Sequence, residues 1–157
     1  MDKIPMTREG VQALEKELRL RISETRPLII AAIAEARAHG DLSENAEYSA
    51  AKEQQSHNEG RIKELESVIG AAEIIDPAQF AGHRTVKFGA NVLIVDENDN
   101  ERRLMIVGEY ESNADEGRIS ISSPIARGLI GKSMGDTVEI RTPKGATSYE
   151  IVEVIFE

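Results

Sequence analysis

Cysteine and tryptophan are both absent from this sequence of 157 residues, and aromatic residues make up only 4% of it. Without cysteine the chain can form neither a disulfide nor a thiolate zinc site, which fits a reducing cytosol. The scarcity of aromatic side chains argues against a large aromatic ligand pocket. The histidines His39, His57 and His83 lack the spacing of metal ligands, so a zinc centre is not predicted.

Long apolar runs and excess positive charge are also missing. No stretch approaches the ~18 apolar residues that a membrane span needs, and the first residues do not form a signal peptide. We therefore expect a soluble, cytoplasmic protein with no membrane contact. The net charge of −9 argues against unaided, non-specific binding of nucleic acid, which a basic surface normally drives.

The N-terminal half predicts two long helices. After Thr7, the predicted N-cap, apolar residues recur at intervals of three and four, and so narrow a stripe suits a single partner helix. Its members are Val11, Leu14, Leu18, Ile22, Thr25, Ile29, Ala32 and Ala36. The second helix is expected from about Glu44 to Ile75, and each arm of about 30 residues would be about 45 Å long. Pro27 interrupts the first arm, where we expect a kink rather than a full break.

The C-terminal half consists of short β-rich runs separated by turn residues. Strands are predicted over residues 85–88, 90–95, 103–107, 119–122, 137–141 and 148–156. Ser123 followed by Pro124 predicts a short helix. The fold class is therefore α+β, with a long antiparallel helical hairpin over residues 1–76 and a small antiparallel-sheet domain with one short helix over residues 77–157.

Between the two helices the chain turns at His39-Gly40 and carries two carboxylates, Asp41 and Glu44. One interpretation is a capping box that starts the second helix, and the spacing alone favours it. The other is metal binding, because Mg²⁺ usually takes only one or two carboxylates from a protein. Two carboxylates at the end of a hairpin would then complete a Mg²⁺ site that another molecule holds.

Three further side chains lie close to this turn in the sequence. Arg37 and Lys52, one on each arm, can either bind a nucleic-acid phosphate or remain ordinary solvated charges. Tyr48 can either stack on a base or pack between the helices. The residues themselves leave both pairs of alternatives open.

Four segments, in this order along the chain, resemble the Gre family of bacterial transcript cleavage factors. They are residues 4–7 (IPMT), 29–37 (IIAAIAEAR), 40–48 (GDLSENAEY) and 123–132 (SPIARGLIGK). The resemblance covers the whole chain and is far more specific than the capping-box spacing.

The resemblance implies a function for each half. The coiled coil is expected to enter the secondary channel of RNA polymerase, and the C-terminal domain, of FKBP-like fold, to dock at the channel rim. The implied protein is a monomer and a transcription factor rather than an enzyme. It has no cofactor of its own and promotes the polymerase's cleavage of the RNA 3′ end in backtracked complexes.

The resemblance also assigns residues. Asp41 and Glu44 are expected to hold a Mg²⁺ ion shared with the polymerase, and Arg37 and Lys52 to contact RNA. Lys52 stands where the family pattern leads us to expect Arg, which keeps the charge but weakens a bidentate phosphate contact. The rim contact is expected at residues Ser122, Ser123 and Pro124.

Three other functions are consistent with parts of the sequence. A prolyl isomerase would share the FKBP-like fold, but fold analogy is a weak argument for activity. A channel regulator that does not promote cleavage would keep the hairpin and alter its tip, whereas Asp41 and Glu44 are both present. A coiled-coil chaperone would not need this tip. Release of short 3′ RNA fragments from backtracked complexes separates these possibilities.

Overall fold

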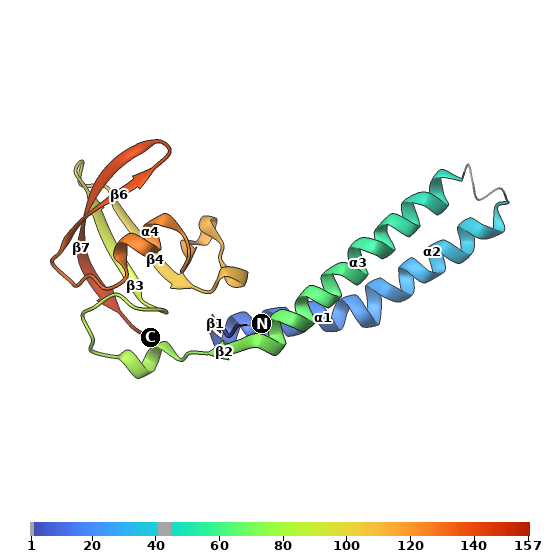
Figure 1. Ribbon diagram of the computed structural model, residues 1–157, viewed down its shortest axis with the longest axis horizontal. Helices are drawn as coiled ribbons and strands as arrows, with labels where there is room; N and C mark the ends of the chain where they lie inside the picture. The colour runs from blue at the N-terminus through green and yellow to red at the C-terminus, as the bar shows by residue number, and fades with distance from the viewer. Residues whose placement is uncertain (1, 41–44) are drawn as a thin grey trace. The chain divides into compact units, whose positions relative to one another are not determined.

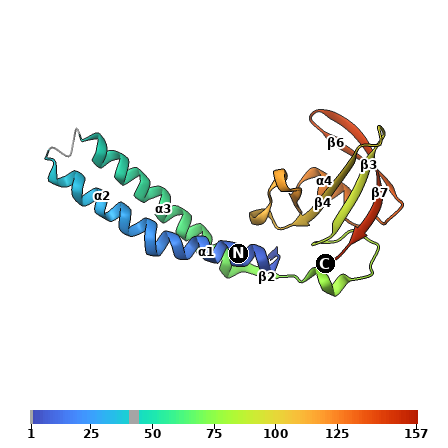
Figure 2. The ribbon, with the colours of Figure 1, turned by 180° about the vertical axis from the view of Figure 1, so that it is seen from behind.

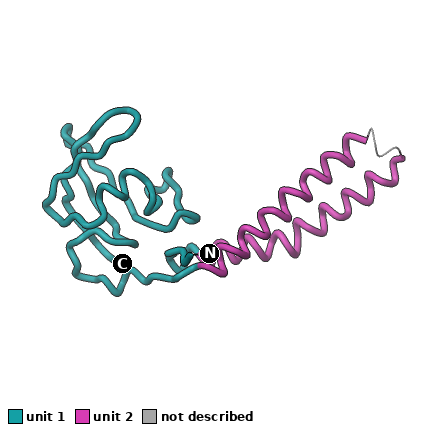
Figure 3. Tube along the Cα trace, viewed as in Figure 1, with its two compact units in different colours: residues 1–10, 72–157 teal, residues 11–71 magenta. Residues whose placement is uncertain are grey.

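The computed structural model describes residues 2–40 and 45–157. The chain forms two compact units, residues 11–71 and residues 1–10 with 72–157 (Figure 3). The sequence predicted a division at residue 76, which assigns the first ten residues to the helical part. That boundary, as a limit of independent folding, stays a prediction.

Residues 11–71 form the predicted helical hairpin. Its first arm consists of α1 (Arg8–Leu20), a π-helical turn (Arg21–Thr25) and α2 (Arg26–Ala38). The second arm is α3 (Ala46–Ala71). Helices α2 and α3 run side by side in both views (Figures 1 and 2). Ile29, Ile33 and Ala51 are buried between them, and Tyr48 packs against this cluster.

Pro27 does not break the first arm, because a π-helical turn precedes it. Proline lacks an N–H and its ring crowds the carbonyl four residues earlier. The N–H of Arg26 donates to the carbonyl of Arg21, one residue further back than in an α-helix. The wider turn therefore accommodates Pro27 near the start of α2.

Part of the predicted apolar stripe is wrong within and after the π-helical turn. Val11, Leu14, Ile29 and Ala36 are buried as predicted, but Ile22 is exposed. Ala32 is exposed as well, and Ile33 takes its place in the core. An extra residue in one turn rotates the following helix relative to a regular repeat of three and four.

Where the apolar stripe is interrupted, polar contacts join the two arms. The guanidinium of Arg61 binds Glu17 in a bidentate manner, with Nε–Oε2 and Nη2–Oε1 distances of 2.8 and 2.9 Å. Arg21 also binds Glu17, at 2.7 Å, and donates to the buried Asn58 at 3.0 Å. These contacts hold the hairpin together beside the π-helical turn.

A prediction about pH follows from Glu17. The hydrogen bonds from Arg61 and then Arg21 lower the pKa of Glu17 from 4.5 to about 2. A carboxylate whose pKa is lowered in the folded state stabilises the fold above its unfolded pKa, and this contribution is lost as the pH falls. Glu17→Gln should therefore lower the melting temperature at pH 7, and the difference from wild type should shrink between about pH 5 and pH 2. Thermal melts followed by circular dichroism test this, and a constant difference across that range would contradict it.

The C-terminal unit contains a five-stranded sheet with the order β5-β4-β3-β7-β6. Its strands are β3 (Asn91–Asp96), β4 (Glu101–Val107), β5 (Arg118–Ser120), β6 (Thr137–Thr142) and β7 (Gly145–Ile155). Neighbouring strands are antiparallel except β4 and β5, which pair in parallel, so the sheet is mixed. The predicted strand over residues 85–88 is not formed, and Thr85 makes only an isolated bridge to Ser133.

The short helix α4 (Pro124–Leu129) begins as predicted, because the Ser123 hydroxyl accepts the N–H of Ala126 at 3.2 Å. Ala126 and Leu129 of α4 are buried in the core of the sheet together with residues of every strand. Three short 3-10 turns complete the unit, at Pro77–Phe80, Glu109–Glu111 and Ala114–Glu116.

Two short strands were not predicted. β1 (Ile4–Met6) pairs in parallel with β2 (Ala72–Ile74). The second helix therefore ends at Ala71 and not near Ile75. Three-residue strands are too short to show an alternating pattern, and the apolar Ala72 and Ile75 continue the helical spacing.

Glu111 connects the N-terminal segment to the sheet. Its side chain is only 3% exposed, and its carboxylate accepts the backbone N–H groups of Thr7 at 2.9 Å and Gly108 at 3.1 Å. The Thr7 hydroxyl and Arg118 Nη2, the latter at 3.2 Å, also donate to it. Thr7 in turn caps α1 by accepting the N–H of Gly10 at 3.0 Å. One buried carboxylate therefore joins Thr7, the residue that caps α1, to Gly108 and Arg118 of the same unit.

Candidate functional site

The end of α2 is closed by His39 and Gly40. The N–H of His39 donates to Ala36 at 3.2 Å, and the N–H of Gly40 donates to Arg37 at 3.3 Å. Gly40 has a φ of +111°, a conformation that favours glycine. The predicted helix end at His39-Gly40 is confirmed.

The start of α3 is capped by Asn45, which the sequence analysis did not identify. Its side-chain Oδ1 accepts the N–H of Tyr48 at 3.0 Å, the bond that an N-cap residue makes. Its Nδ2 donates to the carbonyl of Ala36 in α2 at 2.8 Å. Asn45 therefore caps α3 and bonds to the carbonyl of Ala36 in α2, so that it links the two arms.

This cap corrects the predicted capping box. The box assigned the start of the second helix to Asp41 and Glu44, whereas α3 begins at Ala46 and Asn45 caps it. Asn45 could have been found from the sequence, since Asn ranks with Asp as an N-cap residue. Asp41 and Glu44 themselves lie outside the described residues.

The role of Asn45 leads to a prediction on stability. Asn45→Ala removes both hydrogen bonds and should cost about 1–2 kcal/mol, the upper part of the range for a lost cap. Asn45→Asp keeps the acceptor for the N–H of Tyr48 but cannot donate to the carbonyl of Ala36. It should therefore lower the free energy of unfolding by less than Asn45→Ala does. Chemical unfolding followed by helical circular dichroism compares the two variants. Equal stability of Asn45→Ala and wild type would show that the cap contributes nothing.

Arg37 and Lys52 lie on facing helices and line one hollow of about 250 Å³. Its other lining residues are Ile30, Ile33, Ala34 and Gln55. The guanidinium of Arg37 lies 6.0 Å from the ring centroid of Tyr48, and Lys52 Nζ donates to Gln55 Oε1 at 2.9 Å. The structure therefore brings the two predicted phosphate-binding cations together over an apolar floor.

The three predicted docking residues precede and begin α4. Ser122 and Pro124 are exposed, and Ser123 caps the helix. The hydroxyls of Ser120 and Ser122 are 2.8 Å apart, and the N–H of Ser122 donates to Ser120 Oγ at 3.1 Å. These bonds fix the turn that presents Ser122 and Pro124 at the surface.

Residues 2–40 and 45–157 contain no group of three or more His, Cys, Asp or Glu side chains that could hold a metal ion. In the same described ranges, no helix is long and apolar enough to cross a membrane.

Two family models match the chain and together span most of it. The model for the N-terminal part of transcription elongation factors matches residues 4–74. The model for the C-terminal part of the GreA/GreB transcription elongation factors matches residues 81–156.

Curated relatives match over nearly the whole length. Transcription elongation factor GreA of Azorhizobium caulinodans is 63% identical to this chain, and the match covers 98% of this chain and 98% of the relative. The GreA of Beijerinckia indica is 60% identical over 100% of both chains. Among solved structures, a GreA/GreB elongation factor from Nitrosomonas europaea is 22% identical over 98% of this chain and 100% of its own, with a TM-score of 0.43.

Proposed function

Because this chain belongs to the GreA/GreB family of transcription elongation factors, and so stimulates transcript cleavage by RNA polymerase, we propose that the end of its helical hairpin supplies the residues that promote this cleavage. The observation that carries the proposal is the family match over both halves together with the segment Gly40 to Tyr48. The protein is an activator, and the catalytic centre belongs to the polymerase.

Asp41 and Glu44 are the proposed Mg²⁺ ligands. Carboxylate oxygens are the donors that Mg²⁺ prefers, and one or two of them are what it usually takes from a protein. In a phosphodiester site a second Mg²⁺ supplies an activated hydroxide and neutralises developing charge. Two carboxylates leave most coordination positions to waters, phosphate oxygens and polymerase residues, so no metal site is expected in the isolated protein.

Arg37 and Lys52 are the proposed contacts to the RNA. Their position on the same hollow allows both to approach one phosphate from opposite helices. Tyr48 supports this arrangement because its ring lies beside the Arg37 guanidinium and packs against Ile29, Ile33 and Ala51. A cation held over a ring loses less freedom on binding than one on an unsupported side chain.

The C-terminal unit is proposed to dock on the rim of the polymerase's secondary channel through residues Ser122, Ser123 and Pro124. Docking there would let the hairpin reach the RNA 3′ end. The protein is proposed to act as a monomer in the bacterial cytoplasm. The hydrogen bond between Ser120 and Ser122 and the Ser123 cap of α4 give this contact a defined shape.

Addition of the purified protein to backtracked complexes tests the proposal. Short 3′ RNA fragments should be released in a Mg²⁺-dependent reaction, and the shortened transcripts should resume elongation. The same protein with Mg²⁺ should leave free RNA intact, because two carboxylates cannot assemble a two-metal site. Cleavage of free RNA without polymerase would refute the assignment of catalysis to the polymerase.

A further inference from the structure

Two stretches of the C-terminal unit, residues 77–95 and 117–135, contain no Asp or Glu. They are the longest such stretches in a chain with 28 acidic residues. The fold joins them by backbone hydrogen bonds, from Val86 to Lys132 at 2.7 Å, from Gly131 to Val86 at 3.0 Å and from Met134 to Arg84 at 3.0 Å. Segments that are far apart in the sequence thus form one surface without carboxylates of their own.

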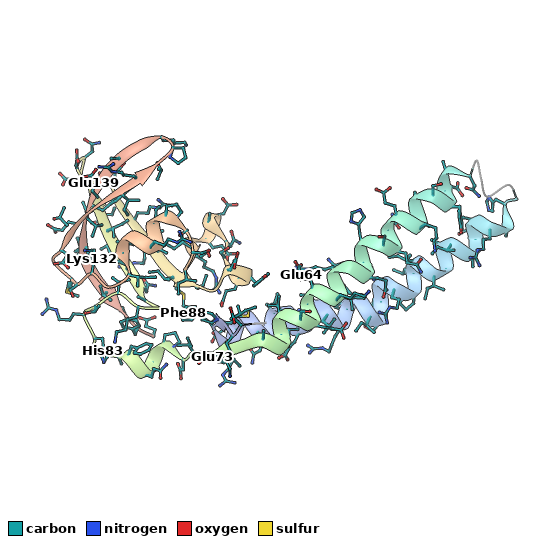
Figure 4. All side chains as sticks on the ribbon, viewed as in Figure 1. Glu64, Glu73, His83, Phe88, Lys132 and Glu139 are labelled. Atoms are coloured by element: carbon teal, nitrogen blue, oxygen red, sulfur yellow. The ribbon has the colours of Figure 1, made fainter. Side chains whose placement is uncertain are left out.

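Five Arg and Lys residues lie on these joined stretches. Three of them, Arg84, Lys87 and Lys132, make up what we refer to as the cationic face. Arg84 and Lys132 are exposed and Lys87 is half-buried. Figure 4 shows Lys132 and His83 on the same side of the unit. Lys87 Nζ lies 3.0 Å from His83 Nδ1 and 4.9 Å from the ring centroid of Phe80. Lys87 is therefore held by a ring nitrogen and an aromatic ring rather than by an acidic side chain.

The charges of this face differ in their pairing from those of three arginines of the same unit. Arg103, Arg118 and Arg141 each lie within 3.6 Å of a Glu carboxylate. Within residues 2–40 and 45–157, no carboxylate oxygen lies within 4.0 Å of the charged nitrogens of Arg84, Lys87 or Lys132. Asp136, which follows the second stretch, accepts the N–H of Ser133 at 2.8 Å and is engaged with the backbone.

We propose that the cationic face binds a carboxylate-bearing surface of RNA polymerase and extends the docking contact at residues 122–124. This inference rests on the proposed function and specifies the chemistry of its docking partner. The second acid-free stretch contains both the docking turn and Lys132, so the two contacts are continuous along the chain. Complementary charges at the edge of an interface mainly raise the association rate and suppress wrong partners.

An acidic protein surface fits the face better than nucleic acid does. Three cations on a chain of net charge −9 offer few phosphate contacts, and the rest of the protein repels a polyanion. A protein surface presents only local charge, which a small face can match.

Charge reversal at the face provides the test. The variant Arg84→Glu/Lys87→Glu/Lys132→Glu should bind purified polymerase at least about 30-fold more weakly at about 0.1 M salt, mostly through slower association. The difference should shrink strongly at about 1 M salt, where charges are screened beyond about 3 Å. The matched control is Arg102→Glu/Arg141→Glu/Lys144→Glu, which changes the net charge equally at exposed cations outside the face. The control variant should bind polymerase within about threefold of wild type, because its three charges lie outside the proposed contact.

A cleavage titration separates this inference from the proposed function. The face variant should need a higher concentration than wild type for half-maximal cleavage. This increase should match the increase in its dissociation constant for polymerase. If wild-type protein promotes no cleavage, the proposed function fails. If wild type promotes cleavage and the face variant binds as the control does, the face is not a docking surface. Binding of wild type to labelled RNA or DNA without polymerase, lost in the face variant, would also overturn the inference, because the ligand would then be phosphate.

Discussion

Replacing Asp41 by Asn together with Glu44 by Gln should reduce stimulation of transcript cleavage by about 100-fold or more, equivalent to about 2.7 kcal/mol of activation free energy. The double variant has nearly the shape of wild type but lacks both negative charges that would hold Mg²⁺. Helical content and melting temperature should stay unchanged, because Asn45 caps α3 and remains in place. The variant should also still compete with wild type for polymerase, since the docking residues are intact.

The natural control is Glu47→Gln. Glu47 is an exposed acidic residue in the first turn of α3, three positions beyond Glu44, and is not one of the proposed ligands. It should retain cleavage within about threefold of wild type, as expected for a residue that makes no transition-state contact. Cleavage rates on backtracked complexes at saturating protein make the comparison. Near-normal stimulation by the double variant would show that Asp41 and Glu44 are not ligands.

Local patterns were sufficient for much of the fold. Apolar spacing predicted both arms of the hairpin, and alternation predicted strands that form in β3, β4, β6 and β7. Ser123-Pro124 predicted the start of α4 because a cap and an N1 proline act within one helical turn. Each of these signals depends on residues only a few positions apart.

The features that were missed depend on longer-range or competing interactions. At the π-helical turn, Arg21 exchanges hydrogen bonds with Asn58, which lies 37 positions away in the sequence. The strands β1 and β2 form only because two distant segments pair. Glu111 and Thr7 are 104 positions apart, and no local pattern connects them.

The candidate site shows the same division. The sequence placed Arg37 and Lys52 on opposite arms near the turn, and the structure brings them to one hollow. The cap was assigned to Asp41 and Glu44, because S/T/D-x-x-E spacing fits a capping box. Asn45 serves instead, and its second bond, to Ala36 across the hairpin, could not be inferred before the two arms were placed together.

Glu111 offers the largest expected effect on stability, because four donors converge on one buried carboxylate. Close packing accompanies these bonds. A side-chain carbon on Gly10 would collide with the Glu111 carboxylate, and one on Gly108 would collide with the carbonyl of Pro5. Both glycines therefore allow the close approach of the chain segments around Glu111.

Glu111→Ala should therefore destabilise the fold by about 3–5 kcal/mol, the usual cost of removing one partner of a buried ion pair. The Arg118 guanidinium and the N–H groups of Thr7 and Gly108 would lose their acceptor. Denaturant unfolding measures the loss, with the exposed neighbour Glu109→Ala as control, expected within about 0.5 kcal/mol of wild type. In a double-mutant cycle, Thr7→Ala should cost less in the Glu111→Ala background than in wild type, because the two residues share a hydrogen bond. Additive effects of the two substitutions, or a loss at Glu111 no larger than at Glu109, would contradict the proposed connection between Thr7 and Glu111.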